Sequence, residues 1–233
     1  MKTNPNGPAD TTMMSVVHDA LRRDLDRLRV SLAGSPEHSD AQRAALGDHV
    51  VWMMDFLHDH HHGEDAGLWP LVRDRNPDAA ELLDRMNADH ATIVPGIAAA
   101  RRAGARYAAD AGARDDLVES LAELSVPLLD HLRREEDEAM PVVSASITER
   151  DWKAWDQRHN VRGKSLSRLA AEGHWLMDGL DPDRYDVLVH LVPAPVRVVV
   201  IKGYAGRYRR ACALRWGTTV DVRPLAEQVR SPS

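Results

Sequence analysis

Apolar residues recur at every third or fourth position over four long stretches of the chain. That spacing is the period of an α-helix that buries one face and exposes the other. The four stretches lie within residues 11–34, 39–70, 82–112 and 117–141. Because the loops between them are short, the pattern predicts an all-α fold built on an antiparallel up-down-up-down four-helix bundle.

Prolines lie within these stretches and at the ends of two of them. Pro70 and then Asn76-Pro77 are expected to break the second helix, and Pro141 the fourth, because proline lacks an N–H group and its ring clashes with the preceding turn. Pro95 and Pro127 fall inside the third and fourth helices. They should kink those helices, at a cost of about 3 kcal/mol each in a regular helix.

An additional helical region is expected after the bundle. Thr148, with Asp151 three residues later, is close to a capping box, and an apolar stripe continues from there to Gly173. Further helices are expected within residues 181–191 and 196–216. We therefore divide the chain into a disordered N-terminus (1–10), the bundle (11–145), a C-terminal helical subdomain of unknown role (146–222) and a polar tail (223–233).

Composition narrows the class of protein. Of the 233 residues 43% are hydrophobic, which suffices for a real core. Cys212 is the single cysteine, so an intrachain disulfide and a multi-cysteine metal site are excluded. No signal peptide is recognisable, and no stretch approaches the roughly 20 apolar residues of a membrane-spanning helix. We expect a cytoplasmic protein whose metal sites, if any, use histidine and carboxylate.

Charge is distributed unevenly. The net charge is −6, yet residues 187–220 hold six basic residues and no acidic one. No helix-turn-helix signature or aromatic stacking repeat accompanies them, so we expect no nucleic-acid partner. We expect this segment to form a solvated basic face over the acidic bundle rather than a membrane-contact surface.

A duplicated spacing of histidines is the strongest chemical signal. In each half of the bundle a histidine precedes a His-x-x-x-Glu motif, by 42 residues in the first half and by 41 in the second. Each glutamate is followed six residues later by a proline. The duplicated residues are His18, His60, Glu64, His90, His131 and Glu135.

These six side chains should converge on one level of the bundle. Residues four apart share a helix face, and antiparallel packing brings the two halves together. Burying six polar groups among leucines is costly unless a metal satisfies them. Imidazole and carboxylate without thiolate suit iron, manganese or zinc. Six ligands exceed a tetrahedral zinc site and fit two octahedral irons bridged by Glu64 and Glu135.

The residues near these six are weaker candidates for metal ligands. Adjacent histidines are not expected to face inward together, so His61 should hydrogen-bond the ligands from outside or face solvent. Asp65 has the same expected role, and His61 with Asp65 forms a rival pair four residues apart. His49 lies too far along its helix to ligate and should serve core packing or line an access path. Glu136 is read as part of a solvated face.

The pattern of His18, His60-x-x-x-Glu64, His90 and His131-x-x-x-Glu135 resembles the hemerythrin-like proteins with HHE cation-binding domains, over roughly residues 10–145. The resemblance implies two iron ions with an oxo or hydroxo bridge, which meet dioxygen, peroxide or nitric oxide. Hemerythrins proper have a further histidine one turn before the third-helix ligand, where this chain has Met86. One iron should then be less saturated, and Met86 should flank the site without ligating.

Three functions follow as hypotheses. The first is a module that binds oxygen, peroxide or nitric oxide at the di-iron site. The second is a di-iron oxidoreductase that decomposes peroxide or oxidises a substrate shaped by the C-terminal region. The third is an iron buffer without turnover. Zinc and manganese are the alternative metals.

Overall fold

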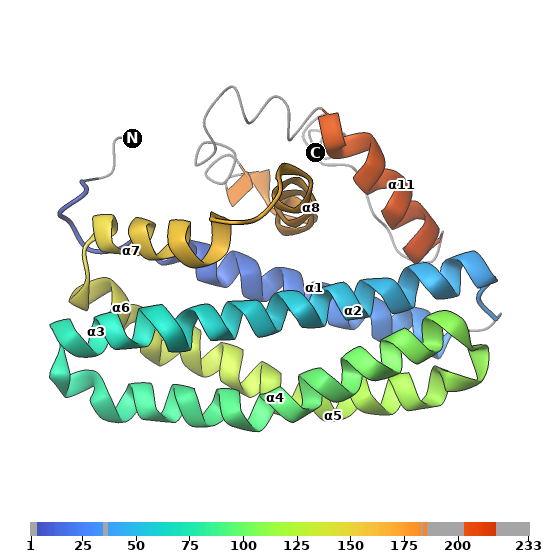
Figure 1. Ribbon diagram of the computed structural model, residues 1–233, viewed down its shortest axis with the longest axis horizontal. Coiled ribbons are helices and arrows are strands. Elements are labelled where there is room, and N and C mark those ends of the chain that lie inside the picture. The colour runs from blue at the N-terminus through green and yellow to red at the C-terminus, as the bar shows by residue number, and fades with distance from the viewer. Residues whose placement is uncertain (1–3, 35–36, 183, 186–202, 218–233) are drawn as a thin grey trace.

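Four long antiparallel helices form the body of the protein (Figure 1). The computed structural model describes residues 4–34, 37–182, 184–185 and 203–217, and no strand occurs among them. The arms of the bundle are α1 (Thr12–Ala33), α2 (Asp40–Gly63), α4 (Ala80–Ala109) and α5 (Arg114–Arg134). The predicted all-α four-helix bundle is confirmed.

Local sequence explains where the arms begin. The side chain of Ser39 accepts a hydrogen bond from the backbone N–H of Gln42 and so caps α2. Asp110 accepts from Gly112 in the tight link formed by η3 (Ala111–Ala113). The link before α4 is likewise a short 3₁₀ turn, η2 (Pro77–Ala79). Short links of this kind force consecutive arms to run antiparallel.

Neither Pro70 nor Pro141 ends its helix, so that part of the prediction is wrong. The second arm passes through a π-helical turn, η1 (Glu64–Leu68), into α3 (Trp69–Arg75). The fourth arm passes through η4 (Glu135–Ala139) into α6 (Met140–Ser146) in the same way. In a π-turn the N–H bonds five residues back instead of four, and this wider turn admits the proline ring at the start of the next α-helical segment.

The other two prolines lie inside continuous helices. Pro95 is within α4 and Pro127 is within α5. The ribbon of α4 changes direction about midway along its length (Figure 1), as an internal proline predicts.

Two apolar clusters fill the bundle on either side of one polar layer. The larger cluster includes Leu21 and Leu57, and the smaller one includes Met14 and Leu68. Along α1 the order is Met14, His18, Leu21, so the polar residue separates the clusters. The other arms repeat this order around their own polar residues. The candidate site is therefore a buried polar layer in an otherwise apolar core.

The C-terminal region covers one side of the bundle (Figure 1). It contains α7 (Glu149–Asp156), a π-turn η5 (Gln157–Val161), α8 (Leu166–Met177) and α11 (Tyr204–Trp216). The capping box of Thr148 and Asp151 is present. A single helix from Thr148 to Gly173 is not, because the chain turns at Gly163, whose φ of 85° suits glycine alone.

The N-terminal segment corrects another expectation. Residues 1–10 were expected to be disordered, but residues 4–10 run beside residues 147–150. The backbone N–H of Glu149 donates to the carbonyl of Gly7, and the N–H of Ala9 donates to the carbonyl of Ile147. The predicted helix over 181–191 falls mostly outside the described residues, as do Val196 to Ile201 and the polar tail 223–233. Among the described helices, none is long and apolar enough to span a membrane.

Candidate metal centre

The six residues singled out by duplicated spacing do lie together in the polar layer. α1 carries one of them, α4 another, and the second and fourth arms carry two each at the junctions with η1 and η4. All six are buried, with at most 6% of any one exposed. They are His18, His60, Glu64, His90, His131 and Glu135.

Each carboxylate lies between two imidazoles from different arms. Glu64 has Oε1 3.1 Å from Nε2 of His60 and Oε2 3.5 Å from Nε2 of His90. Glu135 has Oε2 3.2 Å from Nε2 of His18 and 3.6 Å from Nε2 of His131. Glu64 therefore links the second arm to α4, and Glu135 links α1 to the fourth arm, at one level of the bundle.

His61 is also part of this layer, contrary to the expectation that it faces solvent or hydrogen-bonds the ligands. It is 3% exposed, and neither of its ring nitrogens has a hydrogen-bond partner. Its ring stacks on that of His90 at 4.2 Å and meets His131 edge-on at 5.1 Å. Its neighbour His62, by contrast, is exposed.

The donor atoms form two groups, each compact enough for one ion. His18, His60 and Glu135 make the first group, and His61, His90 and His131 make the second; within each, the donors lie within 4.8 Å of one another. Adjacent residues on a helix point about 100° apart. Two inward histidines in sequence are therefore compatible with a layer that is two ions wide, since His60 and His61 serve different groups.

Carboxylates outside the layer hold the imidazoles in place. Nδ1 of His90 lies 2.7 Å from Oδ1 of Asp65, in agreement with the role expected of Asp65. Nδ1 of His18 lies 2.8 Å from Oε1 of Glu136, and Arg22 donates to both oxygens of Glu136 at 2.8 and 3.0 Å. Such contacts fix the tautomer and orientation of a histidine that ligates through its other nitrogen.

Glu136 was missed at the level of sequence, where it was read as solvated. A signal was available in the duplication itself, because an acid follows the glutamate in both halves, as Glu64-Asp65 and Glu135-Glu136. In each half this second acid reaches the lone histidine of an arm, His90 or His18. A third carboxylate, Asp89, lies 3.5 Å from Nδ1 of His131.

The charges of the histidines and glutamates in the layer do not balance one another. Burial lowers the pKa of His60 to about 3 and that of His131 to about 4, which keeps both imidazoles neutral. Burial, reinforced by repulsion from Glu135, raises the pKa of Glu64 well above its usual value. Burial opposes ionisation of Glu135 too, but the hydrogen bond and the charge of the His18 imidazole outweigh it and lower that pKa to about 2.

The unsatisfied atoms show what would complete the layer. Buried polar atoms almost always have partners, and an orphaned one costs free energy. Here the atoms without a hydrogen bond are concentrated on the inward faces of the proposed ligands. They include Nε2 of His18 and His60, both nitrogens of His61, and both carboxylate oxygens of Glu64 and Glu135. Imidazole nitrogens and carboxylate oxygens are metal-ligating atoms, so cations in the layer would satisfy the two carboxylates and one nitrogen of each imidazole.

Two other residues fall outside this chemistry. Met86 is fully buried in the smaller apolar cluster, one turn before His90. His49 is buried further along α2, where its Nε2 lies 2.7 Å from Oδ2 of Asp24. Its expected role in packing rather than ligation agrees with this position.

Comparison with known families supports the same reading of the bundle. The family model described as Hemerythrin HHE cation binding domain matches residues 9–143. No curated protein and no solved structure gives a significant match. The matched range covers more than half of the chain and includes all four arms and every residue of the polar layer. The chain is therefore a member of the hemerythrin HHE cation-binding domain family.

Proposed function

We propose that the polar layer binds two iron ions and that the pair binds a small oxidant or diatomic molecule: dioxygen, peroxide or nitric oxide. The observation that carries this proposal is the position of the two glutamates. Glu64 faces His60 of the first group and His90 of the second, and Glu135 faces His18 of the first and His131 of the second. A carboxylate shared in this way suits two adjacent cations.

The donor set supports a six-coordinate ion such as iron over zinc. Imidazole and carboxylate ligands without thiolate suit iron and manganese, and they also bind zinc. Zinc, however, prefers four ligands in a tetrahedron. The layer offers five imidazoles and two carboxylates that could bridge. These are more ligands than two tetrahedral ions with open positions need. They do not fill all the coordination positions of two octahedral ions. Two octahedral ions therefore retain positions for a small molecule.

His61 changes which activity is favoured. Met86 had suggested that one ion lacks an imidazole and that peroxide chemistry results, but His61 supplies an imidazole to the group containing His90 and His131. This removes the structural reason for expecting peroxide turnover. The ligands are buried to 6% exposure or less, which suits a molecule of a few atoms. We therefore place binding of a small molecule ahead of peroxide decomposition and ahead of iron storage.

Metal content and reactivity test this proposal directly. Protein loaded anaerobically with ferrous iron should contain two irons per chain by mass spectrometry. Exposure to nitric oxide or dioxygen should then produce new visible absorption. Rapid gas evolution from hydrogen peroxide, well above that of free iron, would instead favour the enzyme. Stoichiometric zinc, or iron that changes no spectrum with either gas, would contradict the proposal.

His61→Ala tests the seventh ligand, with His62→Ala as its matched control. The exposed His62 is next in the chain and differs from His61 in orientation. His61→Ala should reduce the iron content from two toward one per chain, because the second group loses an imidazole, whereas His62→Ala should retain both. Circular dichroism checks that each variant remains folded. Equal iron content in the two variants would remove His61 from the ligand set.

Glu136→Gln tests the outer carboxylate on His18, with Asp137→Asn as its control. Asp137 carries the same charge but lies 3.8 Å from the exposed Arg133 and away from the ligands. Loss of the outer partner should weaken iron binding by about 10- to 100-fold, the usual effect of removing such a contact. Competition with a calibrated chelator measures this. An equal loss in Asp137→Asn would mean that general charge, not orientation of His18, matters.

A further inference from the structure

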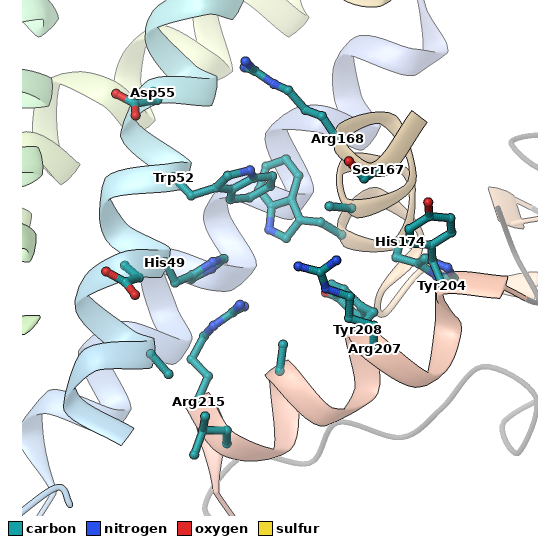
Figure 2. A pocket seen from close by; sticks show the side chains of 16 residues that line it. His49, Trp52, Asp55, Ser167, Arg168, His174, Tyr204, Arg207, Tyr208 and Arg215 are labelled. Atoms are coloured by element: carbon teal, nitrogen blue, oxygen red, sulfur yellow. The ribbon is translucent and has the colours of Figure 1, made fainter. Parts of the chain in front are cut away.

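A cavity lies outside the metal layer, between α2, α8 and α11 (Figure 2). Its volume is about 600 Å³, within the range of sites that enclose small molecules. Rings from six residues line it: His49, Trp52, His174, Trp175, Tyr204 and Tyr208. The cavity joins the bundle to the C-terminal region, whose role the sequence left open.

The aromatic floor of the cavity is held rigidly from below. Asp24 is fully buried, and its Oδ2 accepts hydrogen bonds from Nε2 of His49 at 2.7 Å and from Nε1 of Trp175 at 2.8 Å. Arg23 and Arg27 contact Oδ1 of the same carboxylate at 2.9 and 3.1 Å. Two lining rings are thus fixed before any ligand arrives, which lowers the entropic cost of binding.

The aromatic rings that line the cavity pack against one another in defined orientations. The rings of Trp52 and His49 are stacked 5.6 Å apart, and that of Trp175 meets Trp52 edge-on at 5.1 Å. A planar ligand ring can therefore meet both the faces and the edges of fixed aromatic groups. An aliphatic ligand would gain area from such walls but no benefit from their geometry.

Positive charge is directed into this aromatic space. The side chains of Arg207 and Arg215, both on α11, point toward the middle of the cavity (Figure 2). Nε of Arg215 is buried without a hydrogen-bond partner, and Arg207 has no ion-pair partner among the described residues. Burial and, next, the charge of Arg215 lower the pKa of His49 to about 4, so His49 adds no charge of its own.

The other charged lining groups are largely compensated. Arg168 is paired with Glu172 and Asp59, and Asp55 is paired with Arg101. Asp48 also lines the cavity and opposes the two arginines in part. Two guanidinium groups against one carboxylate leave an excess of positive charge at the α11 edge. The nearby Arg209 and Arg210 are exposed.

From this combination we propose that the cavity binds a small planar aromatic anion, such as an aryl carboxylate. Its ring would pack among Trp52, Trp175 and Tyr208, and its carboxylate would accept hydrogen bonds from the guanidinium groups of Arg207 and Arg215. Guanidinium matches a planar carboxylate through paired N–H donors. The site is specific for charge as well as for aromatic character.

This cavity is distinct from the metal layer. Phe56 lies between them, 4.9 Å from the ring of Trp175 on one side and 6.2 Å from that of His60 on the other. A ligand in the cavity therefore stays separated from the metal ligands by a packed ring. The proposal does not depend on which metal the layer holds, and its test does not use iron chemistry.

Binding of 2-naphthoate, compared with the neutral 2-naphthol, tests the proposal on the full chain. Tryptophan fluorescence should report binding, because Trp52 and Trp175 line the cavity, and isothermal titration calorimetry gives the affinity. The wild-type protein should bind 2-naphthoate more tightly than 2-naphthol. Arg207→Gln combined with Arg215→Gln should weaken 2-naphthoate binding by about tenfold or more, as loss of charge-assisted hydrogen bonds implies, and should leave 2-naphthol unaffected.

Three further variants distinguish loss of the cavity charge from general effects on the protein. Arg209→Gln removes the same charge from α11 outside the cavity and should leave both affinities unchanged. Ala211→Leu places bulk in the cavity wall and should abolish binding of both compounds. Arg207→Gln alone, on an exposed side chain, serves if the double variant unfolds. Absence of 2-naphthoate binding, or equal affinity for the two compounds, would overturn the proposal.

Discussion

Burial of a layer of histidines and glutamates across the bundle is the constraint on which the rest of the structure depends. The layer separates two apolar clusters, and many of its inward-facing polar atoms have no hydrogen-bond partner among the described side chains. Unpaired polar groups in such a place cost free energy, and a charged one costs far more. Under the proposed function, cations bound between these side chains would offset this cost and connect the arms that carry them. The same side chains would then serve both the fold and the function.

Duplication is visible in the backbone as well as in the ligands. In both halves a His-x-x-x-Glu motif leads into a π-turn that begins at the glutamate itself. The widened turn admits Pro70 or Pro141 and directs the next acid, Asp65 or Glu136, to a histidine of another arm. π-Turns of this kind are frequent at functional sites. Here each π-turn places a glutamate of the polar layer beside an acid that contacts a histidine of another arm.

Much of the bundle could be predicted from sequence, because periodicity and duplicated spacing are local signals. They identified the four arms and the six residues that the structure brings together. His61 could not be found in this way. Helical periodicity assigns only one of two adjacent residues to the buried face, so it gives no sign that His60 and His61 both point into the polar layer. The endings assigned to Pro70 and Pro141 failed because a π-turn leaves no periodic signature. The aromatic cavity joins Trp52, Trp175 and Arg207, which only tertiary packing brings together.

A Mössbauer spectrum of protein loaded with ⁵⁷Fe tests the central claim most directly, because it reports whether two irons interact. Ferric ions that share Glu64 and Glu135 should couple antiferromagnetically. The oxidised protein should then show quadrupole doublets without magnetic splitting at 4 K in a weak field. Magnetically split signals of isolated high-spin ferric ions in protein that contains two irons per chain would contradict a layer built for two adjacent metals.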